Sequence, residues 1–362
     1  MALQSSGTIR WSEIANEFGY SVPGTTQISL GNYRNSDPQF SNRNVGSLTD
    51  LPLSINSGPN ANTDIPRGGT IRASDFYNAR LNMVLNLYSG PTEFRVDCRA
   101  RYNSNTGVAI VGGYTGRPSN PSGKRVIVNI NKTFGSAEDT HITTCAVKTG
   151  DWGANSSTDL DIEIGSQGKI YGAGGDGGDG GSANGSGGQN GKSGSTALGV
   201  QYPCSINNLG RIQAGYGGGG GGGGRREYRR SGKKSGRWVG SSGGGGGGGA
   251  GVQNSPGWWS SDGGDAPQDS YGGGSNGSDG GNGVDITSGN GGAGGSSAGS
   301  GGNGGAVNNS STKGSDGGSA GGGGGTGGAN GYAIITTNAT TDYTISGSGN
   351  VVGRQKANVI VY

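Results

Sequence analysis

Glycine dominates the second half of this chain and constrains its fold more than any other feature. Residues 165–331 hold 67 of the 87 glycines in a sequence of 362 residues, so about two residues in five are glycine there. Average glycine usage is about 7%. Only 28% of the whole chain is apolar, and a stretch so poor in side chains cannot fold by burying them. The segment is therefore either flexible or held in order by contacts between backbone groups.

Triplets of two glycines and one other residue recur in the segment, as in GGD-GGD-GGS from Gly174. A left-handed helix of the polyproline-II type has three residues per turn, so such triplets leave two of its three edges without side chains. We therefore predict a glycine-rich polyglycine-II helix bundle. The alternative is a flexible linker, which glycine's conformational freedom favours. The uninterrupted runs 217–224 and 243–249 are hard to explain as spacing alone.

A short motif interrupts the glycine-rich segment and also closes the chain. In each copy an apolar residue stands four positions before a glycine, and a second apolar residue stands two positions after it; the copies are 164–170, 206–212 and 345–351. Each copy predicts a strand, a tight turn and a second strand. The glycine tracts are then excursions from a small β framework.

Residues 81–164 alternate between apolar and polar, as in Val126, Val128 and Ile130. Alternation is typical of strands with one buried face, and here it predicts a small antiparallel β-sandwich. The last strand, 159–164, places three acids on one face. We interpret that face as solvated; the alternatives are a cation site and acid/base chemistry.

The first 80 residues contain a duplicated motif, GTIRWSEI at 7–14 and GTIRASDF at 69–76. Ser12 and Ser74 are expected to cap short helices, with Glu13 and Asp75 in the first turn. The polar segment 20–68 between the copies is typical of an extended arm that packs on another protein.

The chain therefore divides into four regions. They are an N-terminal region at 1–80, an antiparallel β domain at 81–164, a glycine-rich domain with displayed loops at 165–331, and a closing β segment at 332–362. The predicted fold class is mostly β, with short N-terminal helices and little other α-helix.

A basic segment lies between the two longest glycine runs and is expected to form the loop at their tip. It reads RREYRRSGKKSGRW, with one acid, and its candidate binding residues are Arg225, Arg226, Tyr228, Arg229, Arg230, Lys233, Lys234, Arg237 and Trp238. Arginine clusters bind phosphate or carboxylate, and aromatic rings stack on sugars. Contact with a receptor is the favoured interpretation. A solvated or assembly loop and a nucleic-acid site are the alternatives.

A second group of large aromatics stands where no ordinary core is expected: Trp258 and Trp259, with Tyr271 downstream. Such residues are enriched at the centres of interfaces, so these three are also candidate receptor-binding residues. The alternative is that they clamp the edge of the glycine-rich domain.

Nothing in the sequence indicates an active site, a metal site or a cofactor. His141 is the single histidine, and Cys98, Cys145 and Cys204 match no zinc or redox spacing, so we expect small, reduced core cysteines. No basic and apolar leader opens the chain, and no window approaches the roughly 18 apolar residues of a membrane span.

Several of these motifs resemble one group of proteins. QSSGTIRWSEIANEFG and GGTIRASDFY resemble the N-termini of bacteriophage tail and fibre proteins. GKIYGAGGDGGDGG, INNLGRIQAGYGGGGGGGG and NGYAII resemble their glycine-rich host-specificity regions. The combination is similar to T-even-type tail-fibre tip adhesins, although here β segments interleave with the glycine region and follow it.

The resemblance implies a non-enzymatic virion component of the tail, made in the host cytoplasm. Its partners would be other tail proteins at residues 1–80 and a bacterial surface receptor, either an outer-membrane protein or a polysaccharide. Neither nucleic acid nor membrane insertion is expected, and a homotrimer is compatible with the resemblance. The main alternative is a structural fibre or adaptor that carries a separate adhesin. An ice-binding or matrix protein and a capsule depolymerase are further alternatives.

Overall fold

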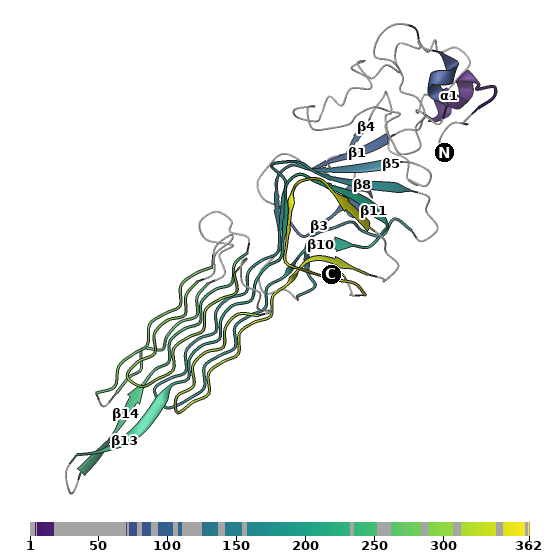
Figure 1. Cartoon of the computed structure of the whole chain (residues 1–362). Coiled ribbons are helices and arrows are strands. Elements are labelled where there is room, and N and C mark those ends of the chain that lie inside the picture. Colours follow the sequence, from purple (N-terminus) through teal and green to yellow (C-terminus); the bar gives the residue numbers. More distant parts are fainter. Residues whose placement is uncertain are drawn as a thin grey trace.

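The computed structural model describes seventeen stretches of the chain. They are 4, 6–17, 70, 72–77, 82–87, 93–103, 108–110, 125–136, 142–153, 158–231, 235–251, 262–271, 273–283, 289–306, 313–337, 343–358 and 361. The described residues form two short N-terminal helices, a β body, and a long stem that leaves the body and ends in a hairpin (Figure 1).

Three sheets make up the β body. Sheet 1 has the order β4–β1–β5–β8–β11–β16, with strands β1 (Asn82–Leu87), β4 (Val108–Ile110), β5 (Arg125–Ile130), β8 (Asp159–Ile164), β11 (Cys204–Asn208) and β16 (Tyr343–Ser346). Sheet 2 has the order β2–β6–β9–β12–β17, with β2 (Glu93–Phe94), β6 (Thr133–Gly135), β9 (Lys169–Tyr171), β12 (Arg211–Gln213) and β17 (Asn350–Val352). Sheet 3 has the order β3–β7–β10–β15–β18, with β3 (Val96–Asp97), β7 (Cys145–Lys148), β10 (Thr196–Val200), β15 (Tyr332–Thr336) and β18 (Arg354–Lys356).

The chain visits the three sheets in turn, so the body is a parallel β-solenoid. One coil is β5, β6 and β7, the next is β8, β9 and β10, and the one after is β11, β12 and β15. Neighbouring coils pair in parallel in all three sheets, whereas β4 pairs antiparallel with β1 at one end.

Apolar side chains stack from coil to coil inside the solenoid. The longest ladder, in sheet 1, runs through Leu85, Val128, Ile162, Ile206 and Ile345. The first four are at most 1% exposed, whereas Ile345 in the last coil is 41% exposed. The parallel register therefore builds one continuous core from the inward-facing residue of each strand.

The strand–turn–strand motif found in the sequence is confirmed as consecutive coils. Its three glycines lie at the same corner: an added Cβ would sit 2.4 Å from the Ile130 oxygen at Gly168, 2.1 Å from the Gly168 oxygen at Gly210, and 2.6 Å from the Gly210 oxygen at Gly349. The first copy is offset from the second by two residues in the sheet. Ile206 of the second copy stacks on Ile162, whereas the sequence motif aligns it with Ile164. The turn of the first copy is two residues longer.

The stem consists of glycine-rich segments that leave the solenoid between sheets 2 and 3. One excursion connects β9 to β10, and the other, much longer, connects β12 to β15. In the central segment 217–224, successive N–H groups donate to different neighbours: Gly218 to the Lys192 oxygen, Gly219 to Gly247 and Gly220 to Ser315, at 2.7–2.9 Å. Backbone hydrogen bonds thus hold the stem together in several directions, unlike a flexible linker.

Side chains at the third position of the triplets satisfy the outer backbone of the stem. Asp176 Oδ1 accepts a hydrogen bond from the N–H of Asp262 and Asp179 Oδ1 one from that of Asp265, both at 2.9 Å. A short side chain with an acceptor oxygen at every third residue therefore pairs backbone N–H groups that the surrounding glycines cannot reach.

The fold class predicted from the sequence is wrong. There is no antiparallel β-sandwich: the three sheets are parallel, and among the described strands only β1–β4 and the hairpin pair antiparallel. The described residues of 165–331 form extended segments to which no helix is assigned, so the structure shows no polyglycine-II helix bundle. Val126, Val128 and Ile130 are buried as predicted, but so are the residues between them in β5, and alternation carries no information on strand direction.

Short helices occur in and after the N-terminal region: α1 (Trp11–Glu17), η3 (Ala73–Phe76) and α2 (Cys98–Asn103). The predicted caps Ser12 and Ser74 are wrong, because each serine is the second residue of its helix and the cap of η3 is Arg72. Instead, Glu13 accepts a hydrogen bond from the N–H of Arg10, and Asp75 accepts one from the N–H of Arg72, both at 2.7 Å. The two copies of the motif therefore share this hydrogen bond, although α1 is an α-helix and η3 is a 3₁₀ helix.

The apolar ladder of sheet 1 can be tested with two variants. Replacing Ile162 with alanine removes buried methyl groups and is expected to lower the free energy of unfolding by about 2–5 kcal/mol. Ile345→Ala at the exposed end of the same ladder is expected to cost less than about 1.5 kcal/mol. Denaturant unfolding monitored by circular dichroism measures both. Equal losses would contradict a core that ends at the last coil.

The stem can be tested with two glycines that differ only in their surroundings. A Cβ at Gly221 would lie 1.9 Å from the Asp179 oxygen, whereas one at Gly323 would meet nothing within 4 Å. Gly221→Ala is therefore expected to destabilise the stem by about 2 kcal/mol or more. Gly323→Ala is expected to change stability by less than about 1 kcal/mol. Calorimetric melting temperatures compare them; indistinguishable values would refute close backbone packing.

Candidate functional site

The basic segment forms a β-hairpin at the far end of the stem (Figure 1). Strand β13 (Arg225–Ser231) pairs antiparallel with β14 (Ser235–Ser241) over seven residue pairs. The glycine runs on either side are neighbours: Gly219 donates to the Gly247 oxygen at 2.7 Å and Gly222 to the Gly244 oxygen at 2.8 Å. The prediction that this segment lies at their tip is confirmed.

Tyr271 joins the base of the hairpin. Its N–H donates to the Gly240 oxygen at 3.1 Å, and the Gly240 N–H donates to the Tyr271 oxygen at 3.0 Å. A Cβ at Gly240 would lie 2.4 Å from the Tyr271 ring. The ring therefore packs against a position without a side chain, 31 residues away in sequence.

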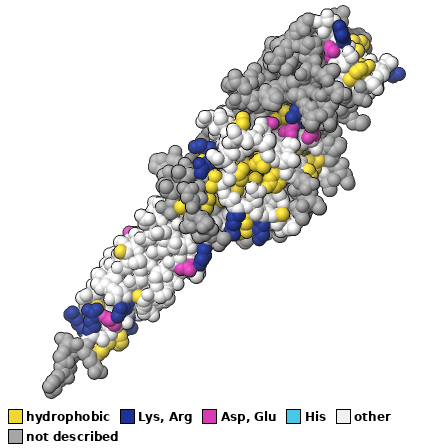
Figure 2. Space-filling view, in the orientation of Figure 1, with side chains coloured by type: hydrophobic (Ala, Val, Ile, Leu, Met, Phe, Trp, Pro, Cys, Tyr) yellow, Lys and Arg dark blue, Asp and Glu magenta, His cyan; other side chains and the backbone are white. Residues whose placement is uncertain are grey.

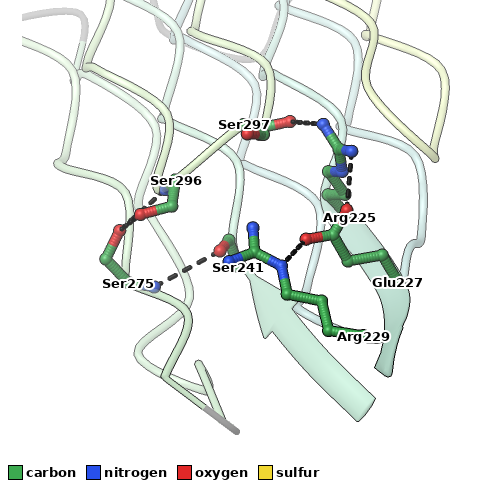
Figure 3. A network of polar contacts seen from close by, with 7 residues as sticks. All are labelled: Arg225, Glu227, Arg229, Ser241, Ser275, Ser296 and Ser297. Atoms are coloured by element: carbon green, nitrogen blue, oxygen red, sulfur yellow. Dashed lines mark hydrogen bonds and ion pairs between the residues drawn. The ribbon is translucent and has the colours of Figure 1, made fainter. Parts of the chain in front are cut away.

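One side of the hairpin, which we call the ionic face, carries ion pairs. Alternate residues of a strand share a face, and so do residues directly opposite each other. This face therefore holds Arg225, Glu227 and Arg229 of β13, and Arg229 lies opposite Arg237 of β14. Glu227 pairs with Arg225 at 2.7 Å and also with Arg229 (Figure 3). The hydrogen bond from Arg229 and, next among the partners, Arg225 lower the pKa of this carboxyl.

The ionic face is also tied to the stem. Arg225 Nη1 donates to the backbone oxygen of Ser297 at 3.4 Å, in a turn where the chain reverses (Figure 3). Ser297 has φ of 61°, a left-handed conformation. Close by, the N–H of Ser275 donates to the hydroxyl of Ser241 in β14 at 3.3 Å, and the hydroxyls of Ser275 and Ser296 lie 2.9 Å apart (Figure 3). These contacts fix the orientation of the hairpin at its base.

The other side, which we call the aromatic face, carries Tyr228 opposite Trp238. Their ring centroids are 5.2 Å apart with an interplanar angle of 62°, an edge-to-face arrangement. The Arg226 guanidinium lies over the Trp238 ring, 4.3 Å from its centroid. A Cβ at Gly236 would lie 2.3 Å from the Tyr228 ring, so that ring also packs against bare backbone.

The aromatic rings of the tip are exposed, although large apolar side chains usually are not. Tyr228 is 50% exposed, Trp238 is 48% exposed and Tyr271 is 37% exposed. Figure 2 shows Lys and Arg side chains beside hydrophobic ones at this end of the stem. Residues 225–238 have a formal charge of +6, whereas the whole chain has +3, so the remainder is −3. The hairpin is therefore a local positive pole.

The structure brings together some of the predicted binding residues. Arg225, Arg226, Tyr228, Arg229, Arg237, Trp238 and Tyr271 all lie at the tip. The side chain of Arg230 and the residues Lys233, Lys234, Trp258 and Trp259 lie outside the described part. Gly251, which precedes the segment containing the two tryptophans, packs at the solenoid end of the stem, beside Gly174.

Sequence reasoning missed the two faces of the hairpin and the grouping of Tyr271 with it. Alternation was available as a signal, because arginine and glutamate alternate with arginine and tyrosine in RREYRR. No local pattern indicates that Tyr271 contacts Gly240, since that contact depends on how the stem segments return.

A second polar cluster lies on β8, where a solvated acidic face was predicted. That interpretation is wrong for Asp161, which is 6% exposed and pairs with Arg125 at 2.5 Å. Glu163 accepts a hydrogen bond from Asn207 Nδ2 at 2.7 Å, and partial burial raises the pKa of its carboxyl. These contacts tie three neighbouring coils together.

The three cysteines are free and buried, as predicted. Burial raises the pKa of all three thiols, to about 12 for Cys145 and Cys204. His141 lies outside the described residues. Within the described residues no group of three or more His, Cys, Asp and Glu could hold a metal ion. The helices described are all too short or too polar to cross a membrane.

Comparison with known proteins adds no relative: no family model, no curated protein and no solved structure matches this chain.

The ion pairs of Glu227 make a testable prediction about pH. Because its pKa is lowered in the folded hairpin, the pairs persist above the ordinary pKa of about 4.3 and are lost as the pH falls through the lowered value. Carbon-detected NMR should place the titration midpoint of the Glu227 carboxyl below about 4.3 and that of the Glu163 carboxyl above about 4.3. Arg229→Gln should move the Glu227 midpoint upward. An unchanged midpoint would contradict the pairing.

Proposed function

We propose that this chain is a bacteriophage tail adhesin whose hairpin contacts a bacterial surface receptor. One observation carries the proposal: exposed aromatic rings and four described arginines are concentrated at the end of the stem farthest from the N-terminal helices (Figure 1). Exposed tyrosine and tryptophan beside arginine are the residues that most often dominate binding energy. The solenoid and stem would then serve to carry the hairpin outward.

The charge distribution suits approach to an anionic cell surface. Exposed charges act over about 8 Å at physiological ionic strength, so the negative remainder of the chain does not cancel the field at the tip. A local positive pole increases the rate of encounter with anionic partners. The physical expectation is adsorption that weakens as salt rises.

Attachment to the rest of the tail is proposed for the N-terminal region. The two copies of its duplicated motif contact each other through Trp11 and Phe76, whose ring centroids are 6.5 Å apart, and Tyr77 donates to the Gly7 oxygen. Trp11 is nevertheless 54% exposed. An exposed tryptophan at the opposite end from the hairpin is suited to docking on another protein.

A structural fibre component is the second candidate function. Strands β16, β17 and β18 are the outermost strands of their sheets, and Ile345 at this end is 41% exposed. Open sheet edges can pair with strands of another chain. In that case the solenoid end would carry a separate adhesin and the hairpin would be an assembly contact.

Adsorption to bacteria distinguishes the two functions. Fluorescently labelled protein is expected to bind susceptible cells of a strain panel saturably. Replacing Arg225, Arg226, Arg229 and Arg237 with glutamine should weaken binding by about tenfold or more, because the positive pole is lost. The matched control replaces Lys169, Lys192, Lys313 and Lys356, which removes the same charge elsewhere. Absence of wild-type binding, or equal losses in both variants, would favour the structural component.

A further inference from the structure

We propose that the aromatic face of the hairpin binds an anionic saccharide, with a sugar ring against the aromatics and its phosphate or carboxylate on Arg226. This inference rests on the proposed function, which leaves open both the ligand and the face. It follows from a difference between the two faces.

On the ionic face one carboxylate, that of Glu227, already pairs with two of the three described arginines. Glu227 pairs with both Arg225 and Arg229, and Arg225 also reaches the Ser297 oxygen. A ligand anion would have to compete with a carboxylate that is held in place. The ionic face therefore orients the hairpin, and binding there would disrupt its base.

On the aromatic face, no residue of the hairpin itself carries a carboxylate. Arg226 is opposite Gly240, and its guanidinium lies over Trp238. Stacking on an aromatic ring holds a guanidinium flat and leaves its edge N–H groups available for a planar or tetrahedral anion. Arg226 is exposed. It can therefore receive a phosphate or carboxylate without losing a protein partner.

The glycines opposite and beside the rings give this face its shape. Because Gly236 and Gly240 have no side chains, the rings of Tyr228 and Tyr271 pack against backbone and stay exposed. An aromatic surface with a negative π-face suits the C–H groups on the flat side of a sugar ring. Together with one adjacent cation, it matches a sugar that carries a negative charge.

Two other classes of macromolecule fit less well. Nucleic acid binding requires a basic track along the phosphate backbone, whereas the chain outside residues 225–238 has a formal charge of −3. A stable protein interface buries about 800 Å² on each partner, more than one face of a two-stranded ribbon readily offers. A saccharide needs only a few neighbouring side chains.

The test uses the intact protein and a pair of variants with equal charge. Binding is measured on an array of purified bacterial polysaccharides that includes phosphorylated, uronic-acid and neutral chains. Polyglutamate serves as a sugar-free polyanion, and single-stranded DNA serves as a polyanion whose sugars lie within a phosphodiester backbone. Arg226→Gln on the aromatic face is compared with Arg229→Gln on the ionic face. Trp238→Ala tests the aromatic surface, and melting temperatures establish that each variant is folded.

We expect binding to anionic polysaccharides alone. Arg226→Gln and Trp238→Ala should each weaken it by about tenfold, and Arg229→Gln by less than about threefold. Equal losses in the two arginine variants, or equal binding to polyglutamate or DNA, would show simple charge attraction and overturn the inference. So would the absence of any polysaccharide binding by folded wild-type protein.

Adsorption to cells separates this inference from the proposed function. If periodate oxidation of the cell surface abolishes adsorption and protease treatment does not, the saccharide ligand is supported. If only protease abolishes it, the receptor is a protein: the saccharide inference fails while the adhesin function stands. If untreated cells do not bind the protein at all, both fail.

Discussion

The whole molecule depends on one constraint: neighbouring backbone segments hydrogen-bond so closely that no side chain fits between them. In the stem, a Cβ at Gly219 would lie 2.0 Å from the Gly302 oxygen, and one at Gly245 would lie 1.7 Å from the Gly264 oxygen. In the solenoid, the same crowding occurs at the corner glycines, where each coil rests on the one before. Glycine is required there because of contact between backbones and not because of its conformational freedom.

The solenoid sets the register from which the stem extends. Both glycine excursions leave at the same corner from coils that are stacked on each other, so their first residues are already neighbours. Gly172 donates to the Gln213 oxygen and Gly215 to the Ser195 oxygen, both at 2.9 Å. Hydrogen bonding between coils therefore continues without interruption into hydrogen bonding between stem segments. An apolar core at one end stabilises a region that has almost none of its own.

A stem built in this way has consequences for its tip. Its surface consists mainly of backbone and short polar side chains, so it offers few contacts strong enough to compete with those of the hairpin. The surface of the hairpin differs from that of the stem, because it carries charged side chains and exposed aromatic rings. Its two faces divide the work, because the ion pairs of Glu227 fix its position while the rings and Arg226 stay open to solvent. Under the proposed function, recognition and support would therefore belong to separate side chains.

The sequence by itself determined the positions of the strand–turn–strand repeats, the glycine excursions between them, the placement of the basic segment at a tip and the burial of the cysteines. These follow from local patterns, namely period, spacing and composition. Tertiary structure alone decided that the strands run parallel, that Ile206 stacks on Ile162, that Asp161 is buried against Arg125, and that Tyr271 completes the aromatic face. The reason is physical: alternation marks the apolar side of a strand, whereas burial of the other side and the direction and register of pairing depend on segments far apart in the chain.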